Sequence, residues 1–153
     1  MTYADKGDDP KPLLSVMGKF YENYASLYWP LIRITAGVIL LTHGWPKLIG
    51  GVQAFAAGSL AKRGIEPALF LAYVVITLET VGAVLIILGL FTRPIAALLV
   101  IEFLVIIWVH IPNGYAWTNR GYEYPLFWGL IFLAMLLRGG GPYSLDRKIG
   151  KEL

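Results

Sequence analysis

Three ionisable side chains fall inside long apolar stretches of the sequence, where a charge is costly. Arg33, Glu79 and Glu102 are each flanked on both sides by mostly aliphatic and small residues. A charge in the middle of a bilayer costs roughly 2.5–3.5 kcal/mol even on the mildest scale, so such residues usually face other helices and serve function. We therefore take these three as candidate catalytic residues, in a site that handles protons or binds a polar substrate.

Helical spacing indicates how these charges are arranged. At 100° per residue, Arg33 shares a helix face with Gly44, and Glu79 shares a face with Gly82. Small residues mark close contact between membrane helices, so both faces should point into the protein. We predict that Arg33 pairs with Glu79 and that Glu102, which is left without a cation, carries a proton. A purely structural ion pair is the alternative interpretation.

Further polar residues gather toward the ends of the apolar stretches. His43 and His110 lie at similar depths, so they could hold a haem, or a zinc ion together with Glu123. We expect neither, because nothing else in the sequence accompanies these ligands. The aromatic residues around the Pro112–Asn113–Gly114 turn either cap a pocket or form an interfacial belt. The candidate substrate-binding residues are His43, His110, Asn113, Glu123 and Tyr124.

The composition explains why these stretches should be membrane helices. Of the 153 residues, 57% are hydrophobic and only 15% are charged, whereas soluble domains carry roughly 25% charged residues. This balance argues against a soluble domain and excludes a disordered chain. The chain has no cysteine, which excludes disulfides, thiol chemistry and iron–sulfur clusters. The net charge of +3 does not indicate nucleic-acid binding, because the basic residues are scattered.

Four apolar stretches, 29–48, 68–91, 95–111 and 124–137, set the architecture. A spanning helix needs roughly 20 apolar residues, and the turn at 91–93 is too short for anything but an antiparallel hairpin. We predict an all-α integral membrane protein with an antiparallel four-helix transmembrane bundle over 29–138. A flexible polar segment, 1–12, and an amphipathic interfacial helix, 13–28, should precede the bundle, and a cytoplasmic tail, 139–153, should follow it.

The distribution of basic residues predicts the orientation. With four spans, one side carries eight Lys and Arg residues and the other carries four. The side richer in Lys and Arg is cytoplasmic, so both termini should face the cytoplasm and loops 49–66 and 112–123 should face outward.

The order of several short motifs resembles the DoxX family of small four-helix membrane proteins. The resemblance runs from about residue 31 to 147 and implies a bacterial or archaeal cytoplasmic (inner) membrane. Relatives in that family are named for a subunit of a thiosulfate:quinone oxidoreductase or are linked to redox stress and quinone metabolism. The motifs are Arg33–Gly37 with His43–Leu48, Leu78–Gly82, Leu88–Arg93, His110–Gly114, Gly121–Leu126 and Gly141–Asp146.

Three functions follow as alternatives. The first is a quinone-linked membrane oxidoreductase component, in which Arg33, Glu79, Glu102, His110 and Glu123 line a quinone and proton site. Because the chain lacks cysteine and a separate soluble domain, a partner protein would have to supply the redox centre. The second is a non-catalytic membrane anchor or assembly subunit of a larger complex. The third is a small-solute or proton transporter, which would need to form a homo-oligomer. All three place the chain in a lipid bilayer.

Overall fold

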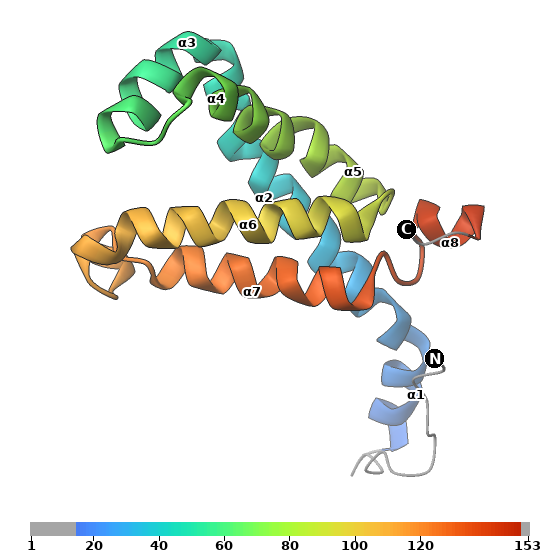
Figure 1. Ribbon diagram of the computed structural model, residues 1–153. Helices are drawn as coiled ribbons and strands as arrows, with labels where there is room; N and C mark the ends of the chain where they lie inside the picture. The colour runs from blue at the N-terminus through green and yellow to red at the C-terminus, as the bar shows by residue number, and fades with distance from the viewer. Residues whose placement is uncertain (1–14, 151–153) are drawn as a thin grey trace.

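A computed structural model describes residues 15–150, which fold entirely into helices and their connections (Figure 1). The predicted polar segment 1–12 lies outside the described residues, as do the first two residues of the predicted interfacial helix. The main helices are α1 (Ser15–Tyr24), α2 (Tyr28–Gly50), α4 (Ala68–Thr77), α5 (Ala83–Leu88), α6 (Thr92–His110), α7 (Glu123–Arg138) and α8 (Leu145–Ile149). Of these, α2, α4 with α5, α6 and α7 begin and end within three residues of the four apolar stretches.

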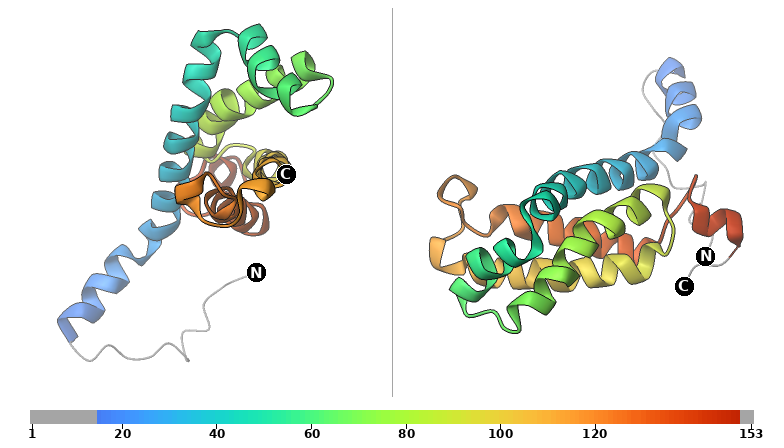
Figure 2. Two further views of the ribbon diagram at one scale, coloured as in Figure 1. Left: turned by 90° about the vertical axis from the view of Figure 1, so that its left-hand side faces the viewer. Right: turned by 90° about the horizontal axis from the view of Figure 1, so that it is seen from above.

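The helices form two pairs. Helix α2 packs along the continuous rod made by α4, the π-helical turn η4 (Leu78–Gly82) and α5, while α6 packs along α7 (Figures 1 and 2). Small side chains allow the first pair to approach closely: a Cβ on Gly37 of α2 would come 2.8 Å from the carbonyl oxygen of Ala83. The two pairs meet through a buried apolar core that includes Leu40, Ala83, Ile86, Leu99, Phe132 and Met135.

Three of the helices in the described chain are long and apolar enough to cross a bilayer. They cover 17–50, 68–88 and 92–113. Helix α7 has 16 residues, which is shorter than the roughly 20 that a spanning helix needs. The expectation of an all-α protein with transmembrane helices is confirmed, whereas the fourth span remains a prediction.

The connections collect at two ends of the molecule. The helical connection 51–67, which contains α3 (Val52–Phe55), and the loop 111–122 lie toward one end, which we call the loop end (Figure 1). The short turn 89–91 and the segment 139–150 lie at the opposite end, where α1 also leaves the body (Figures 1 and 2). Helix α1 exposes Phe20, Tyr21 and Tyr24. Loops 49–66 and 112–123 are predicted on one side of the membrane, and they lie at the same end of the molecule (Figure 1). The side of the membrane that each end faces remains a prediction.

A network of hydrogen bonds fixes the end opposite the loop end. The two carboxylate oxygens of Asp146 accept hydrogen bonds from the backbone N–H groups of Phe91 and Thr92, at 2.8 and 3.0 Å. These amides open α6, where a helix leaves its first N–H groups unpaired and favours a negative charge. The indole of Trp29 donates to the carbonyl of Gly139 at 3.0 Å. Residues 139–149 are therefore packed onto the helices and do not extend away from them.

Candidate functional site

The π-helical turn η4 interrupts the rod that packs against α2 and carries Glu79. Such single π turns inside α-helices occur frequently at functional sites, because the extra residue rotates the side chains that follow it. Glu79 is only 4% exposed. A buried carboxylate needs a partner of opposite charge or strong hydrogen-bond donors.

Lys47 on α2 provides that partner. Its Nζ lies 2.5 Å from both Oε1 and Oε2 of Glu79, so the two side chains form a short, symmetric ion pair. The lysine side chain is 27% exposed and its ammonium also lies 5.0 Å from the centre of the Phe55 ring. The pair thus connects the interior of the protein with its more open loop end.

Gly44 allows this pair to form. A Cβ at Gly44 would lie 2.5 Å from the carbonyl oxygen of Glu79 and 2.7 Å from its Cβ. The absence of a side chain therefore lets α2 touch the backbone of η4, one turn before Lys47. Because Gly44 and Lys47 lie on the same helix face, this contact also brings the lysine side chain to Glu79.

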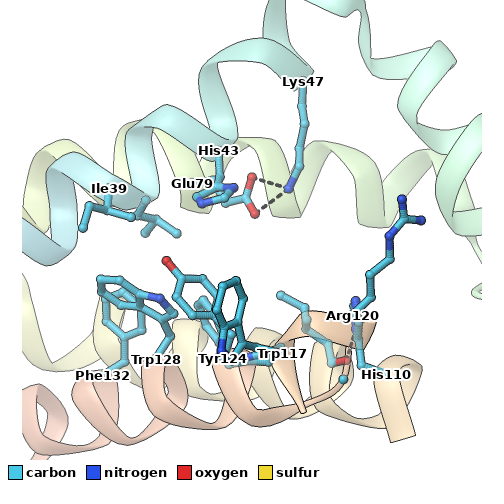
Figure 3. A pocket seen from close by; sticks show the side chains of 15 residues that line it. Ile39, His43, Lys47, Glu79, His110, Trp117, Arg120, Tyr124, Trp128 and Phe132 are labelled. Carbon is cyan, nitrogen blue, oxygen red and sulfur yellow. Dashed lines mark hydrogen bonds and ion pairs between the residues drawn. The ribbon is translucent and has the colours of Figure 1, made fainter. Parts of the chain in front are cut away.

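A cavity of about 640 Å³ opens beside the ion pair (Figure 3). One wall is formed by α2 and η4, and the opposite wall by α6, α7 and loop 111–122 (Figure 3). Pockets of roughly 300–1,000 Å³ with mainly apolar walls and a few polar groups are typical small-molecule sites. The polar and charged lining residues are His43, Lys47, Glu79, His110, Arg120 and Tyr124, and the apolar ones include Ile39, Leu40, Phe103, Trp117, Trp128 and Phe132.

Loop 111–122 holds the mouth of the cavity in place. The Oε2 of Glu123 accepts a hydrogen bond from the backbone N–H of Trp117 at 3.0 Å, and the side-chain amide of Asn113 donates to the carbonyl of Arg120 at 3.0 Å. A Cβ at Gly121 would collide with the backbone of Tyr115. These contacts present Trp117 and Arg120 to the cavity.

His110 stands where α6 meets this loop. Its Nδ1 lies 2.7 Å from the carbonyl oxygen of Ile106, and a carbonyl can only accept a hydrogen bond. The proton of the neutral ring therefore sits on Nδ1, and Nε2 is left as the acceptor. An imidazole in this state can accept a hydrogen bond from a ligand through Nε2.

Glu102 on α6 is close enough to interact with the ion pair but is not one of the residues that line the cavity. It is 8% exposed, and its carboxyl group interacts electrostatically with both Glu79 and Lys47. Both of its oxygens are enclosed, and apart from the neighbouring carboxyl group of Glu79 none of the described residues offers them a hydrogen-bonding group. Two carboxyl groups and one lysine therefore form a single cluster.

The predicted pair between Arg33 and Glu79 is wrong. Arg33 is 1% exposed and donates to the carbonyls of Ile86 and Ile87, both at 2.8 Å, and to that of Tyr143 at 3.1 Å. Helix α5 ends there, and the last carbonyls of a helix lack intrahelical partners and attract cations. Arg33 therefore caps a helix about two turns away from Glu79.

The cavity brings together four of the eight residues predicted for the site: His43, Glu79, His110 and Tyr124. Glu102 is adjacent, Asn113 and Glu123 order the loop, and Arg33 lies elsewhere. The zinc alternative from His43, His110 and Glu123 is not formed, because no group of three possible metal ligands comes together in the described part of the chain.

Sequence reasoning missed Lys47, Arg120 and the aromatic wall. A signal for Lys47 existed, because it follows Gly44 by three residues on the face that also carries Arg33. Nothing local in the sequence indicated that Trp117, Trp128 and Phe132 share one cavity, because a loop and one helix face must converge to place them there.

Comparison with known proteins agrees with this picture of a small helical membrane protein. Residues 28–111 match the DoxX family. The chain is 30% identical over 135 residues to an uncharacterised protein of Haemophilus influenzae, covering 86% of this chain and 97% of that protein. It is also 30% identical over 129 residues to the inner membrane protein YphA of Escherichia coli, covering 77% and 87%. No solved structure matches.

The fold and these similarities define a helical integral membrane protein. The chain belongs to the DoxX family.

Proposed function

We propose that this DoxX family protein is a quinone-linked membrane oxidoreductase component. The cavity beside Lys47 and Glu79 would bind the quinone headgroup, and a partner protein would deliver the electrons. The observation that carries the proposal is an aromatic cavity with a buried ion pair in its wall, within helices that can span a bilayer.

The walls suit a flat, apolar ring. Trp128 lies against Phe132 with ring centres 6.3 Å apart and an angle of 32° between the rings, and Phe103 continues the stack at 5.4 Å from Phe132. Aromatic side chains offer large faces on which another ring can stack. Ile39 and Leu40 close the other side of the cavity.

The polar groups suit a ligand that accepts hydrogen bonds. Lys47 and Arg120 can only donate, the hydroxyl of Tyr124 can donate, and Glu79 is already engaged by Lys47. The two oxygens of a quinone ring are acceptors on opposite sides of the ring. Lys47 in the wall and Arg120 at the mouth therefore provide donors for the two ends of such a ring.

A partner protein would carry out the electron transfer. The chain has no cysteine, and its described residues contain no cluster of side chains that could hold a metal ion. Its own residues bind and orient the ring and exchange protons with it.

The site also implies an arrangement in the membrane. We propose that α7, extended by Gly121 and Tyr122, completes a four-helix transmembrane bundle, and that both termini are cytoplasmic. The excess of Lys and Arg at the end opposite the loop end supports this orientation. The cavity then lies in the outer half of the membrane, at a depth that a lipid-soluble quinone can reach.

A photoreactive quinone tests the binding site. In membranes or nanodiscs containing the wild-type protein, we expect crosslinks to peptides that carry Tyr124 and Trp128, and competition by unlabelled quinone. Trp128→Ala should reduce this labelling several-fold, because the stacking face is lost. Trp45→Ala is the matched control, since Trp45 is 55% exposed and does not line the cavity.

Other outcomes would favour the alternatives. Labelling spread over lipid-facing residues, without competition, would contradict a quinone site. Uptake of a solute by proteoliposomes containing the purified protein alone would support a transporter instead. A partner complex that forms normally with the Trp128→Ala and Lys47→Met variants, but shows no quinone dependence, would support a non-catalytic anchor.

A further inference from the structure

The carboxyl group of Glu102 is the one charged or acidic group near the cavity that the binding proposal does not use. It is enclosed by protein, and the only hydrogen-bonding group that the described residues bring to its oxygens is the carboxyl group of Glu79. An ionised carboxylate in an apolar interior needs a cation or several donors to remain stable. The surroundings of Glu102 therefore do not suit an isolated carboxylate.

The neighbouring cation is shared with another acid. Lys47 places its Nζ on both oxygens of Glu79, and Glu102 interacts with both members of that pair. If both glutamates were ionised, the cluster would carry two negative charges and one positive charge. The other titratable or charged groups that line the cavity are His43 on α2, His110 on α6, Tyr124 on α7 and Arg120 in the loop. Arg33, also on α2, is held by the carbonyls of Ile86, Ile87 and Tyr143.

We propose that Glu102 and Glu79 hold one proton between them and that this acid pair is the proton store of the cavity. One shared proton leaves the cluster with a single negative charge, which Lys47 balances. Glu79 lines the cavity whereas Glu102 does not, so the proton passes to a ligand by way of Glu79.

The use of the store by a quinone rests on the function proposed above. Reduction of the ring takes two electrons, which the redox partner supplies, and two protons. One carboxyl O–H bond of the pair breaks as an O–H bond forms on a ring oxygen. The second proton, and the one that refills the store, come from the aqueous solution through the mouth of the cavity, and the hydroxide left by each donating water stays in the bulk solution.

Infrared spectroscopy of the ligand-free protein tests the shared proton directly. At neutral pH the wild type should show the C=O stretch of a protonated carboxylic acid, which shifts in D₂O. Glu102→Gln should abolish this band. Glu66→Gln should leave it unchanged, because Glu66 is exposed and accepts a hydrogen bond from the backbone of Ala68.

Two further variants separate a shared proton from an isolated protonated acid. In Glu79→Gln, Lys47 becomes available to Glu102, so Glu102 should ionise and the band should disappear. In Lys47→Met, the band should grow, because neither carboxylate keeps a cation. Should Glu102→Gln fail to fold, Glu102→Asp should shift the band and keep its intensity.

Either of two results would overturn the proposal: no protonated-acid band in the wild type, or a band that Glu79→Gln leaves unchanged. The measurement needs no quinone. Failure of the acid pair is therefore distinguishable from failure of quinone binding, which the crosslinking experiment tests separately.

Discussion

The ammonium of Lys47 sits 2.5 Å from each carboxylate oxygen of Glu79, where α2 touches the π-helical turn of the neighbouring rod. This pair is the polar centre of a cavity whose remaining walls are largely apolar. It joins two elements that depart from regular helix packing: α2 approaches closely at Gly44, and the neighbouring rod contains a π turn.

Removing Lys47 alone should cost more than removing Lys47 together with Glu79. Lys47→Met leaves Glu79 buried without a cation, which destabilises a protein by roughly 3 kcal/mol at a buried pair. The double variant Lys47→Met with Glu79→Gln should recover much of that loss. Thermal unfolding in detergent of both single variants and the double variant measures the coupling, and purely additive losses would contradict a direct pair.

Gly44 should tolerate no side chain. Gly44→Ala places a Cβ against the backbone of Glu79, and overpacking of this kind costs roughly 1–3 kcal/mol. It should also separate Lys47 from Glu79 and weaken quinone crosslinking. Gly50→Ala in the same helix meets no atom within 4 Å and is the matched control. Equal melting temperatures for the two variants would show that the close approach is unimportant.

Arg33 should matter for stability and leave ligand binding intact. Arg33→Met removes the donor to the carbonyls of Ile86, Ile87 and Tyr143, at a cost of at least about 3 kcal/mol. Hydrogen exchange should increase around 86–89 and 143–147, while quinone crosslinking of the folded fraction stays unchanged. The exposed Arg147→Met is the control. Loss of crosslinking in a fully folded Arg33→Met protein would show that Arg33 contributes to quinone binding after all.

Asp146 should protect the start of α6. Asp146→Ala removes both acceptors from the amides of Phe91 and Thr92, and loss of such a cap costs about 1–2 kcal/mol. Amide exchange of these two residues should accelerate, whereas Lys148→Ala, on the exposed side of α8, should have no effect. Unchanged exchange in Asp146→Ala would mean that the segment 139–149 does not cap the helix.

Single cysteines test the orientation, because the natural chain has none. A membrane-impermeant thiol reagent should label Asn119→Cys in intact cells and should label Lys148→Cys only after permeabilisation. Both positions are exposed, and they belong to loop 111–122 and helix α8, which lie at opposite ends of the molecule (Figure 1). The reverse pattern would place the cavity in the cytoplasmic half of the membrane.

The sequence predicts the helices well because hydrophobicity and period are local properties. The apolar stretches coincide with α2, the α4–α5 rod, α6 and α7, and the prolines near their starts agree with the observed helix beginnings. The same local reasoning placed Glu79 and Glu102 inside the protein, and both are buried.

The partners of the charges were not predictable in the same way. Arg33 and Lys47 lie on the same face of α2, and net charge alone cannot distinguish which of them reaches Glu79. Two features decide which cation reaches Glu79. Gly89 ends α5 in a left-handed conformation and leaves free carbonyls that bind Arg33, and the π turn at Glu79 sets the direction of its carboxylate. Both features depend on tertiary packing. The aromatic wall likewise requires α7 and loop 111–122 to converge.

The most direct test of the central claim is the quinone content of the protein itself. Solvent extraction and mass spectrometry of wild-type protein, purified in mild detergent or nanodiscs, should give close to one quinone per protein, well above its proportion in the surrounding lipid. Lys47→Met and Trp128→Ala should lose it, and Trp45→Ala should retain it. A quinone content equal to that of the bulk lipid in the folded wild type, unchanged by all three substitutions, would contradict the account.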